Sequence, residues 1–189
     1  MKKQISRRDK VLQTALKMIS DGGFHASPMS ELAAQSGVAV GTIYHHFESK
    51  EALIHALYLE CRDRMTAEMM NLLDTKASVA KRFEAIWHNL HTYFMKNPLE
   101  FSLLRQYESS PFIQAGTDEE GALFGKPVLD FLRDGIKAGK LKKQKLSVLA
   151  ALLFNFPAAV ASVEMKEGKK QGKKELQELS EMCWASLKK

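Results

Sequence analysis

The chain has 189 residues, of which 45% are hydrophobic and 26% are charged, and its formal net charge is +6. These proportions are those of an ordinary globular protein, so they argue against an intrinsically disordered, collagen-like or disulfide-scaffold protein. The positive charge favours a polyanionic partner but does not indicate a fold.

The beginning of the chain predicts two short helices. A helical apolar period starts after Ser6, and Gly22 and Gly23 should end it, because glycine tolerates the positive φ of a helix C-terminus. Ser27 is then expected to be the N-cap of the second helix, with Pro28 at its first helical position, where the missing N–H costs nothing.

The rest of the chain also follows a helical period, and no useful length alternates apolar and polar residues as a strand would. Ile43 and Phe47 lie four apart on one face of a third short helix, and Ser49 should cap a long fourth helix that reaches about Met70. An all-α protein is therefore expected. Further helices are predicted over residues 79–95, 98–107, 122–136, 146–165 and 173–187.

One predicted helix is unusually apolar. Residues 146–163 contain no charge and approach the length of a membrane span. Asn155 and Pro157 interrupt this run, so a core or interface helix that is apolar all round fits better than a transmembrane helix. No membrane partner is expected.

The two cysteines, Cys61 and Cys183, lie far apart in a chain without a secretory signal. This spacing indicates a reducing cytoplasm, so we expect a cytoplasmic protein. Both residues should be small buried side chains, since a redox sensor needs an exposed thiol with a lowered pKa.

Residues 29–47 have the spacing of a helix-turn-helix. Ala33 is small where two helices would cross, and Gly37 supplies the turn between them. Apolar contacts between the helices would come from Leu32, Val38, Ile43 and Phe47. The outward positions of the third helix are Gly41, Thr42, Tyr44, His45 and His46, which suit a helix that enters the major groove of DNA.

The charge for binding phosphates would have to come from elsewhere. Residues 29–47 contain Glu31 and no Lys or Arg, so Lys50 and the N-terminal arm are the expected sources. The basic residues of that arm are Lys2, Lys3, Arg7, Arg8 and Lys10.

Residues 37–53, GVAVGTIYHHFESKEAL, resemble the hallmark of the TetR (tetracycline repressor) family, and the similarity covers roughly the first 60 residues. The resemblance implies a nine- or ten-helix chain whose first three helices read DNA and whose fourth helix links them to an effector domain. It also implies that the last two helices of each subunit form a four-helix dimer interface. The expected domains are residues 1–49 for DNA binding, and residues 50–189 for effector binding and dimerisation.

The resemblance also implies roles for single residues. The groove-facing residues would be Gly41, Thr42, Tyr44 and His45. Phosphate would be bound by Tyr44, His46 and Lys50, with Ser30 as a further candidate. At Val40 many members of the family have a polar residue that touches bases, so Val40 would contact a thymine methyl group or pack toward Ile43.

Enzyme signatures are weak. Glycine-rich phosphate loops, serine nucleophile elbows and local Cys–His pairings do not occur in the sequence. His88 and His91 are three residues apart on one predicted helix, but no Cys or carboxylate ligand motif accompanies them. We therefore expect no catalytic site, no metal and no cofactor.

The second domain is rich in aromatic residues, which favours an apolar cavity with a few polar groups. The expected function is a ligand-responsive repressor that a small apolar effector releases from a palindromic operator. The alternatives are a helix-turn-helix protein without an effector and an all-α protein that does not bind DNA. The candidate effector ligands are Phe83, Trp87, His88, His91, Phe94, Tyr107, Phe124, Phe131 and Asn155.

A homodimer is expected through the last two helices, residues 146–165 and 173–187. The small side chains of Ala158 and Ala161 would allow close approach across a two-fold axis.

Overall fold

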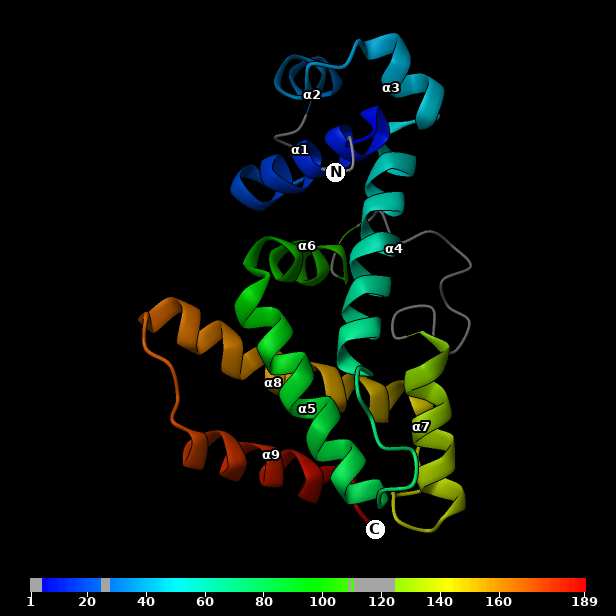
Figure 1. Ribbon diagram of the computed structural model, residues 1–189, viewed down its shortest axis with the longest axis vertical. Coiled ribbons are helices and arrows are strands. Elements are labelled where there is room, and N and C mark those ends of the chain that lie inside the picture. Colours follow the sequence, from blue (N-terminus) through cyan, green and yellow to red (C-terminus); the bar gives the residue numbers. More distant parts are fainter. Residues whose placement is uncertain (1–4, 25–27, 109, 111–124) are drawn as a thin grey trace. The chain divides into compact units, whose positions relative to one another are not determined.

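The computed structural model describes residues 5–24, 28–108, 110 and 125–189, and every regular element in these ranges is a helix (Figure 1). This confirms the all-α prediction. The helices are α1 (Arg7–Gly22), α2 (Met29–Ser36), α3 (Val40–His46), α4 (Lys50–Met69), α5 (Val79–Lys96), α6 (Pro98–Glu108), α7 (Lys126–Lys137), α8 (Leu146–Glu167) and α9 (Lys173–Leu187).

Helix starts follow local capping chemistry. The Ser6 hydroxyl accepts a hydrogen bond from a backbone N–H in the first turn of α1, and Ser49 does the same for α4, each at 3.0 Å. The start of α2 differs from the prediction. Pro28 has ψ 144°, which is extended backbone, so it precedes the helix and Met29 is the first helical residue. The expected cap, Ser27, lies outside the described residues.

The chain forms two compact units, which we describe separately. Unit 1 comprises residues 1–61 and 98–114, and unit 2 comprises residues 62–97 and 115–189. The boundary after residue 61 falls within α4, so the first part of this helix belongs to unit 1 and the last part to unit 2. Helix α6 belongs to unit 1 although it follows α5 in the sequence. The functional boundary after residue 49 stays a prediction, because a compact unit and a functional domain need not coincide.

In unit 1, helix α1 packs against α2, α3 and α6. Tyr107 of α6 is fully buried and stacks on Tyr58 of α4, with ring centroids 3.9 Å apart and planes 11° apart. The Tyr107 hydroxyl lies 2.8 Å from Nδ1 of His55. These contacts attach α6 to the first part of α4.

In unit 2, helix α8 packs against α5, α7 and α9. By length and composition α8 could cross a membrane, but here it contributes Ala150, Leu153, Ala158 and Ala161 to the core. The expected position of Ala158 and Ala161 at a dimer contact is wrong, because both are fully buried by their own chain. The large apolar side chains that α8 exposes are Val148, Leu152 and Val163.

Candidate functional site

A left-handed turn and four apolar side chains hold α2 and α3 together. Gly37 has φ 66° and ψ 23°, a conformation that glycine adopts without strain, and it ends α2. The four residues expected to join the helices are all buried: Leu32, Val38, Ile43 and Phe47. The segment 29–47 therefore has the predicted helix-turn-helix geometry.

The outward face of α3 consists of neutral polar side chains and one glycine. Tyr44 is 48% exposed, and His45, His46 and Gly41 are also exposed, while Thr42 is half-buried. A side chain added at Gly41 would have no atom within 4 Å, so this glycine leaves open space at the surface. Such a surface offers hydrogen-bonding side chains to a partner molecule. Open space at Gly41 also lets a partner come close to the backbone.

Two residues around α3 depart from a fully polar reading surface. Val40 is 39% exposed, and both roles expected for it, contact with a thymine methyl group and packing toward Ile43, stay predictions. Ala39 occupies the N-cap position of α3 and provides no side-chain hydrogen bond, which leaves the first N–H groups of the helix without a capping side chain.

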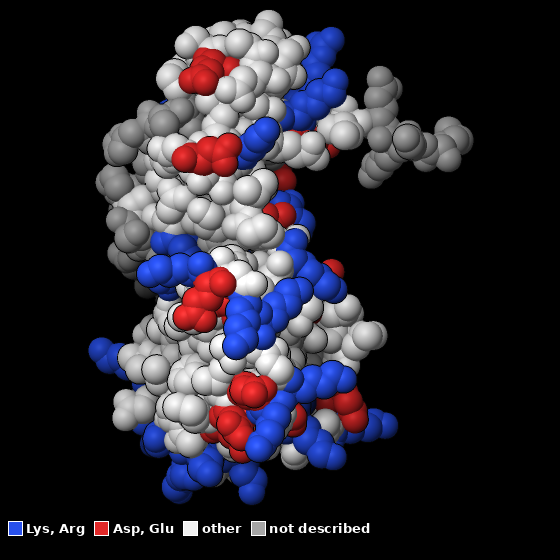
Figure 2. All heavy atoms as spheres, turned by 90° about the vertical axis from the view of Figure 1, so that its left-hand side faces the viewer, with Lys and Arg blue, Asp and Glu red and all other residues white. Residues whose placement is uncertain are grey.

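Positive charge is absent from the segment 29–47 itself, whose single charged residue is Glu31. In Figure 2 the top of unit 1 is mostly uncharged, with Lys and Arg side chains along one edge. Lys50 is half-buried at the first position of α4, where the helix N-terminus also favours an anion. Ser30 is exposed on α2. Lys2 and Lys3 of the basic arm lie outside the described residues.

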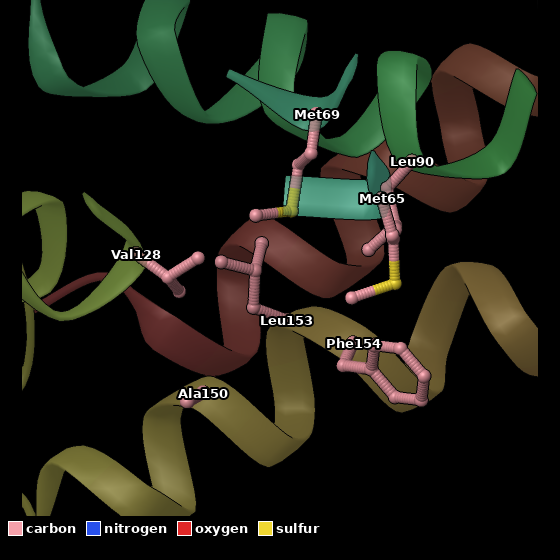
Figure 3. A pocket seen from close by; sticks show the side chains of 7 residues that line it. All are labelled: Met65, Met69, Leu90, Val128, Ala150, Leu153 and Phe154. Atoms are coloured by element: carbon pink, nitrogen blue, oxygen red, sulfur yellow. The ribbon is translucent and has the colours of Figure 1, made fainter. Parts of the chain in front are cut away.

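Unit 2 encloses a small apolar cavity of about 10 Å³ (Figure 3). Every lining side chain is apolar, and the two flexible thioethers of Met65 and Met69 come from α4. The other lining residues are Leu90, Val128, Ala150, Leu153 and Phe154, from α5, α7 and α8. No feature of the sequence separates these residues from ordinary core, so sequence reasoning did not single them out.

None of the expected effector ligands lines this cavity, and Phe124 lies outside the described residues. Phe94 packs edge-to-face on the lining residue Phe154, with ring centroids 5.4 Å apart. Tyr107 belongs to unit 1. Asn155 lies in an open apolar hollow on the surface of α8, between Leu152 and Phe156.

The remaining expected ligands fill the core of unit 2 around α5. Trp87 is fully buried, with His91 stacked on it at 5.7 Å and His88 against its edge at 5.1 Å between centroids. Phe83 packs on Trp184 of α9. Phe131 of α7 lies under the guanidinium group of Arg82. Their binding role stays a prediction that this arrangement does not test.

His91 takes part in a buried polar contact between α5 and α8. Its Nε2 lies 2.6 Å from Oε2 of Glu164, and the second carboxylate oxygen accepts the backbone N–H of Gln171 at 2.5 Å. Glu164 is 2% exposed and His91 is 6% exposed. This contact joins α5 to α8, and the expected role of His91 as an effector ligand stays a prediction.

Both cysteines are fully buried, as expected, and they form no disulfide. Burial raises the pKa of the Cys183 thiol to about 12, so its thiolate is scarce at neutral pH. Among the described residues no group of three His, Cys, Asp or Glu side chains could hold a metal ion.

Comparison with known proteins places both parts of the chain in one family. Residues 11–57 match the bacterial regulatory proteins of the tetR family, and residues 78–188 match the tetracyclin repressor-like C-terminal domain. The HTH-type transcriptional repressor KstR2 of Mycolicibacterium smegmatis is 28% identical over 145 residues, covering 72% of this chain and 68% of that protein. The fatty acid metabolism regulator protein of Bacillus subtilis is 28% identical over 149 residues, covering 76% and 75%.

Solved structures have the same fold. A TetR-family transcriptional regulator from Haemophilus influenzae superposes with a TM-score of 0.82 at 22% identity, covering 97% of each chain. A TetR family transcription regulator from Marinobacter aquaeolei VT8 has a TM-score of 0.85 at 16% identity, covering 96% of this chain and 95% of the other. The helix-turn-helix, the nine described helices and the two family matches show that this chain belongs to the TetR family and is a DNA-binding transcription regulator, not an enzyme.

Proposed function

We propose that the protein is a cytoplasmic repressor that binds a palindromic operator as a homodimer and leaves it when an apolar effector binds. The observation that carries this proposal is the surface of α3. Tyr44, His45 and His46 reach solvent while Ile43 and Phe47 fix the helix from behind. A rigid helix with exposed hydrogen-bonding groups suits the major groove. The relative KstR2 is itself named a transcriptional repressor.

A second copy of the chain is the proposed partner of the exposed face of α8. Val148, Leu152 and Val163 are large apolar side chains left in water, and an open apolar hollow lies beside Leu152. An apolar face of this kind suits a self-complementary two-fold contact. We propose that α9 adds to it through Met182, which is also exposed.

Two-fold symmetry determines the form of the operator. A dimer presents two copies of α3, so the operator should contain two inverted half-sites about one helical turn apart. The phosphate contacts are assigned to Ser30, Tyr44, His46 and Lys50, and the base contacts to Val40, Gly41, Thr42, Tyr44 and His45.

The proposed effector site is the cavity of unit 2. A volume of about 10 Å³ holds at most one water molecule, so an effector must displace side chains to enter. Met65 and Met69 are the most adaptable side chains of its lining, and both lie on α4, whose other end begins at Lys50. Displacing them would shift α4, the helix that follows α3 in the chain. The ligand should be apolar, because the lining offers no polar partner.

The DNA half of this proposal is tested by selecting an operator from random DNA with the wild-type protein and measuring binding by fluorescence anisotropy. Tyr44→Ala and Lys50→Ala should weaken binding to all sequences, and Lys50→Ala should lower the salt slope by about 0.9. Thr42→Ala should mainly relax sequence preference. Lys166→Ala, an exposed lysine of unit 2, is the matched control. Unchanged affinity in the three α3–α4 variants would place the reading surface elsewhere.

The effector half separates this function from a helix-turn-helix protein without a ligand. Compounds that raise the thermal stability of the protein are first found by screening hydrophobic metabolites, drugs and acyl compounds. Each hit is then added to the protein–operator complex, and release of DNA is expected. If stabilising compounds never change the affinity for DNA, the cavity is core only and the effector hypothesis is wrong.

A further inference from the structure

One arginine joins the end of the reading helix to the long helix behind it. Arg8 lies in the first turn of α1, and its Nη1 donates to Oε1 of Glu60 on α4 at 2.5 Å. Its guanidinium carbon also lies 5.4 Å from the centre of the Phe47 ring. All three residues belong to unit 1.

Both ends of this contact occupy structural positions. Phe47 is the C-cap of α3, is buried, and donates its backbone N–H to the carbonyl of Ile43, so it closes the last turn of the reading helix. Glu60 lies ten residues along α4 from Lys50, next to the last residue that α4 contributes to unit 1. A single side chain therefore restrains α3 and α4 together.

We infer that Arg8 is a positioning residue for DNA recognition and not a phosphate ligand like its basic neighbours. The inference rests on the proposed use of α3 to read DNA. A guanidinium group can donate to a carboxylate in its plane while its face lies on an aromatic ring, so Arg8 makes both contacts at once. The same engagement leaves its charge already neutralised by Glu60. Arg7, by contrast, is exposed and has no ion pair within the described part of the chain.

The two roles of Arg8 predict opposite signs for one substitution. Glu60→Gln removes a negative charge and frees the Arg8 charge. If Arg8 served phosphate, operator affinity would therefore rise. If Arg8 positions α3, the loss of its anchor should weaken operator binding by about tenfold, within the range of coupling between contacting residues. Affinity for unrelated DNA, which needs no alignment with base edges, should change by less than about twofold.

The remaining variants separate geometry from charge. Arg8→Lys keeps the charge but loses the planar group, and it should weaken operator binding about as much as Arg8→Gln. Neither should change the salt slope, whereas Arg7→Gln, the matched control, should lower it by about 0.9 if Arg7 meets a phosphate. The double variant Arg8→Gln with Glu60→Gln should bind as weakly as either single variant, because both remove the same contact.

The experiment uses the full-length protein, and circular dichroism checks that each variant is folded, as expected for a half-exposed ion pair. Tighter or unchanged operator binding by Glu60→Gln would overturn the inference, as would a salt slope lowered by about one in Arg8→Gln. If instead the wild-type protein selects no operator from random DNA, it is the proposed function that fails. Rescue by Arg8→Lys would also overturn a role for the planar guanidinium group.

Discussion

Glu164 is the acceptor at the centre of a buried polar contact, and Glu164→Ala should destabilise unit 2. The carboxylate lies 2.6 Å from Nε2 of His91 and accepts the Gln171 backbone N–H at 2.5 Å. Alanine would leave both donors without an acceptor. Each unmet buried donor costs about 1–3 kcal/mol, and His91 bears this in full because it is buried, while half-buried Gln171 regains water. We expect the free energy of unfolding to fall by about 3 kcal/mol.

The loss can be measured as a change in Tm. In a protein of this size about 1 kcal/mol corresponds to about 2–4 °C, so Glu164→Ala should melt about 6–12 °C below the wild type. Far-ultraviolet circular dichroism follows the transition, with all variants at one protein concentration because the Tm of the proposed dimer would depend on it.

Two controls make this prediction specific. Glu167→Ala removes an exposed carboxylate from the end of the same helix and should change the free energy of unfolding by less than about 0.5 kcal/mol. Glu164→Gln retains one acceptor oxygen, so its Tm should fall between those of Glu164→Ala and the wild type. Equal Tm values for Glu164→Ala and Glu167→Ala would refute the reasoning, since the buried contact would then contribute nothing.

Three further predictions address packing, chemistry and assembly. Gly135→Ala should lower the free energy of unfolding by about 1–3 kcal/mol, because its Cβ would lie 2.5 Å from Cδ1 of Leu141; Gly41→Ala meets no atom and should keep stability while weakening operator binding. Burial raises the pKa of Cys183 from 9.0 to about 12, so the stability contributed by its neutral thiol should be complete below pH 9 and be lost as the pH rises toward 12. The free energy of unfolding, measured by denaturant titration across this range, should show this loss in the wild type but not in Cys183→Ala. Leu152→Arg should give monomers by light scattering, and a variant that remains dimeric would exclude the exposed face of α8 as the interface.

The fold was largely predictable because its signals are local. Glycine and serine positions mark helix ends, and α9 has the predicted bounds, Lys173–Leu187. Local signals also explain the error at α2, because a proline suits both the first helical position and the residue before it, and only the backbone angle of Pro28 decides between them. The contact between α1 and α6 joins segments far apart in the sequence, so helical periodicity could not reveal it.

The reading surface was more predictable than the cavity for the same reason. On a short helix, periodicity alone separates the buried Ile43 and Phe47 from the exposed Tyr44 and His45. The cavity is assembled from four helices, and its residues are the apolar types that fill any core. Residue type was misleading at Ala158 as well, since a small side chain permits close approach to helices of the same chain as readily as to a partner.

The use of aromatic and polar side chains in the frame of unit 2 follows from the small energies available for regulation. A hundredfold preference of an effector for the non-binding state corresponds to about 2.7 kcal/mol. This coupling free energy is close to the loss of unfolding free energy expected when the Glu164 contact is broken. Deforming a flexible helix packing in unit 2 would therefore consume all of it. The contact between His91 and Glu164 joins α5 to α8, and the ring of Trp87 stacks on His91 within α5. The adaptable side chains, Met65 and Met69, lie instead on α4, the helix that begins at Lys50.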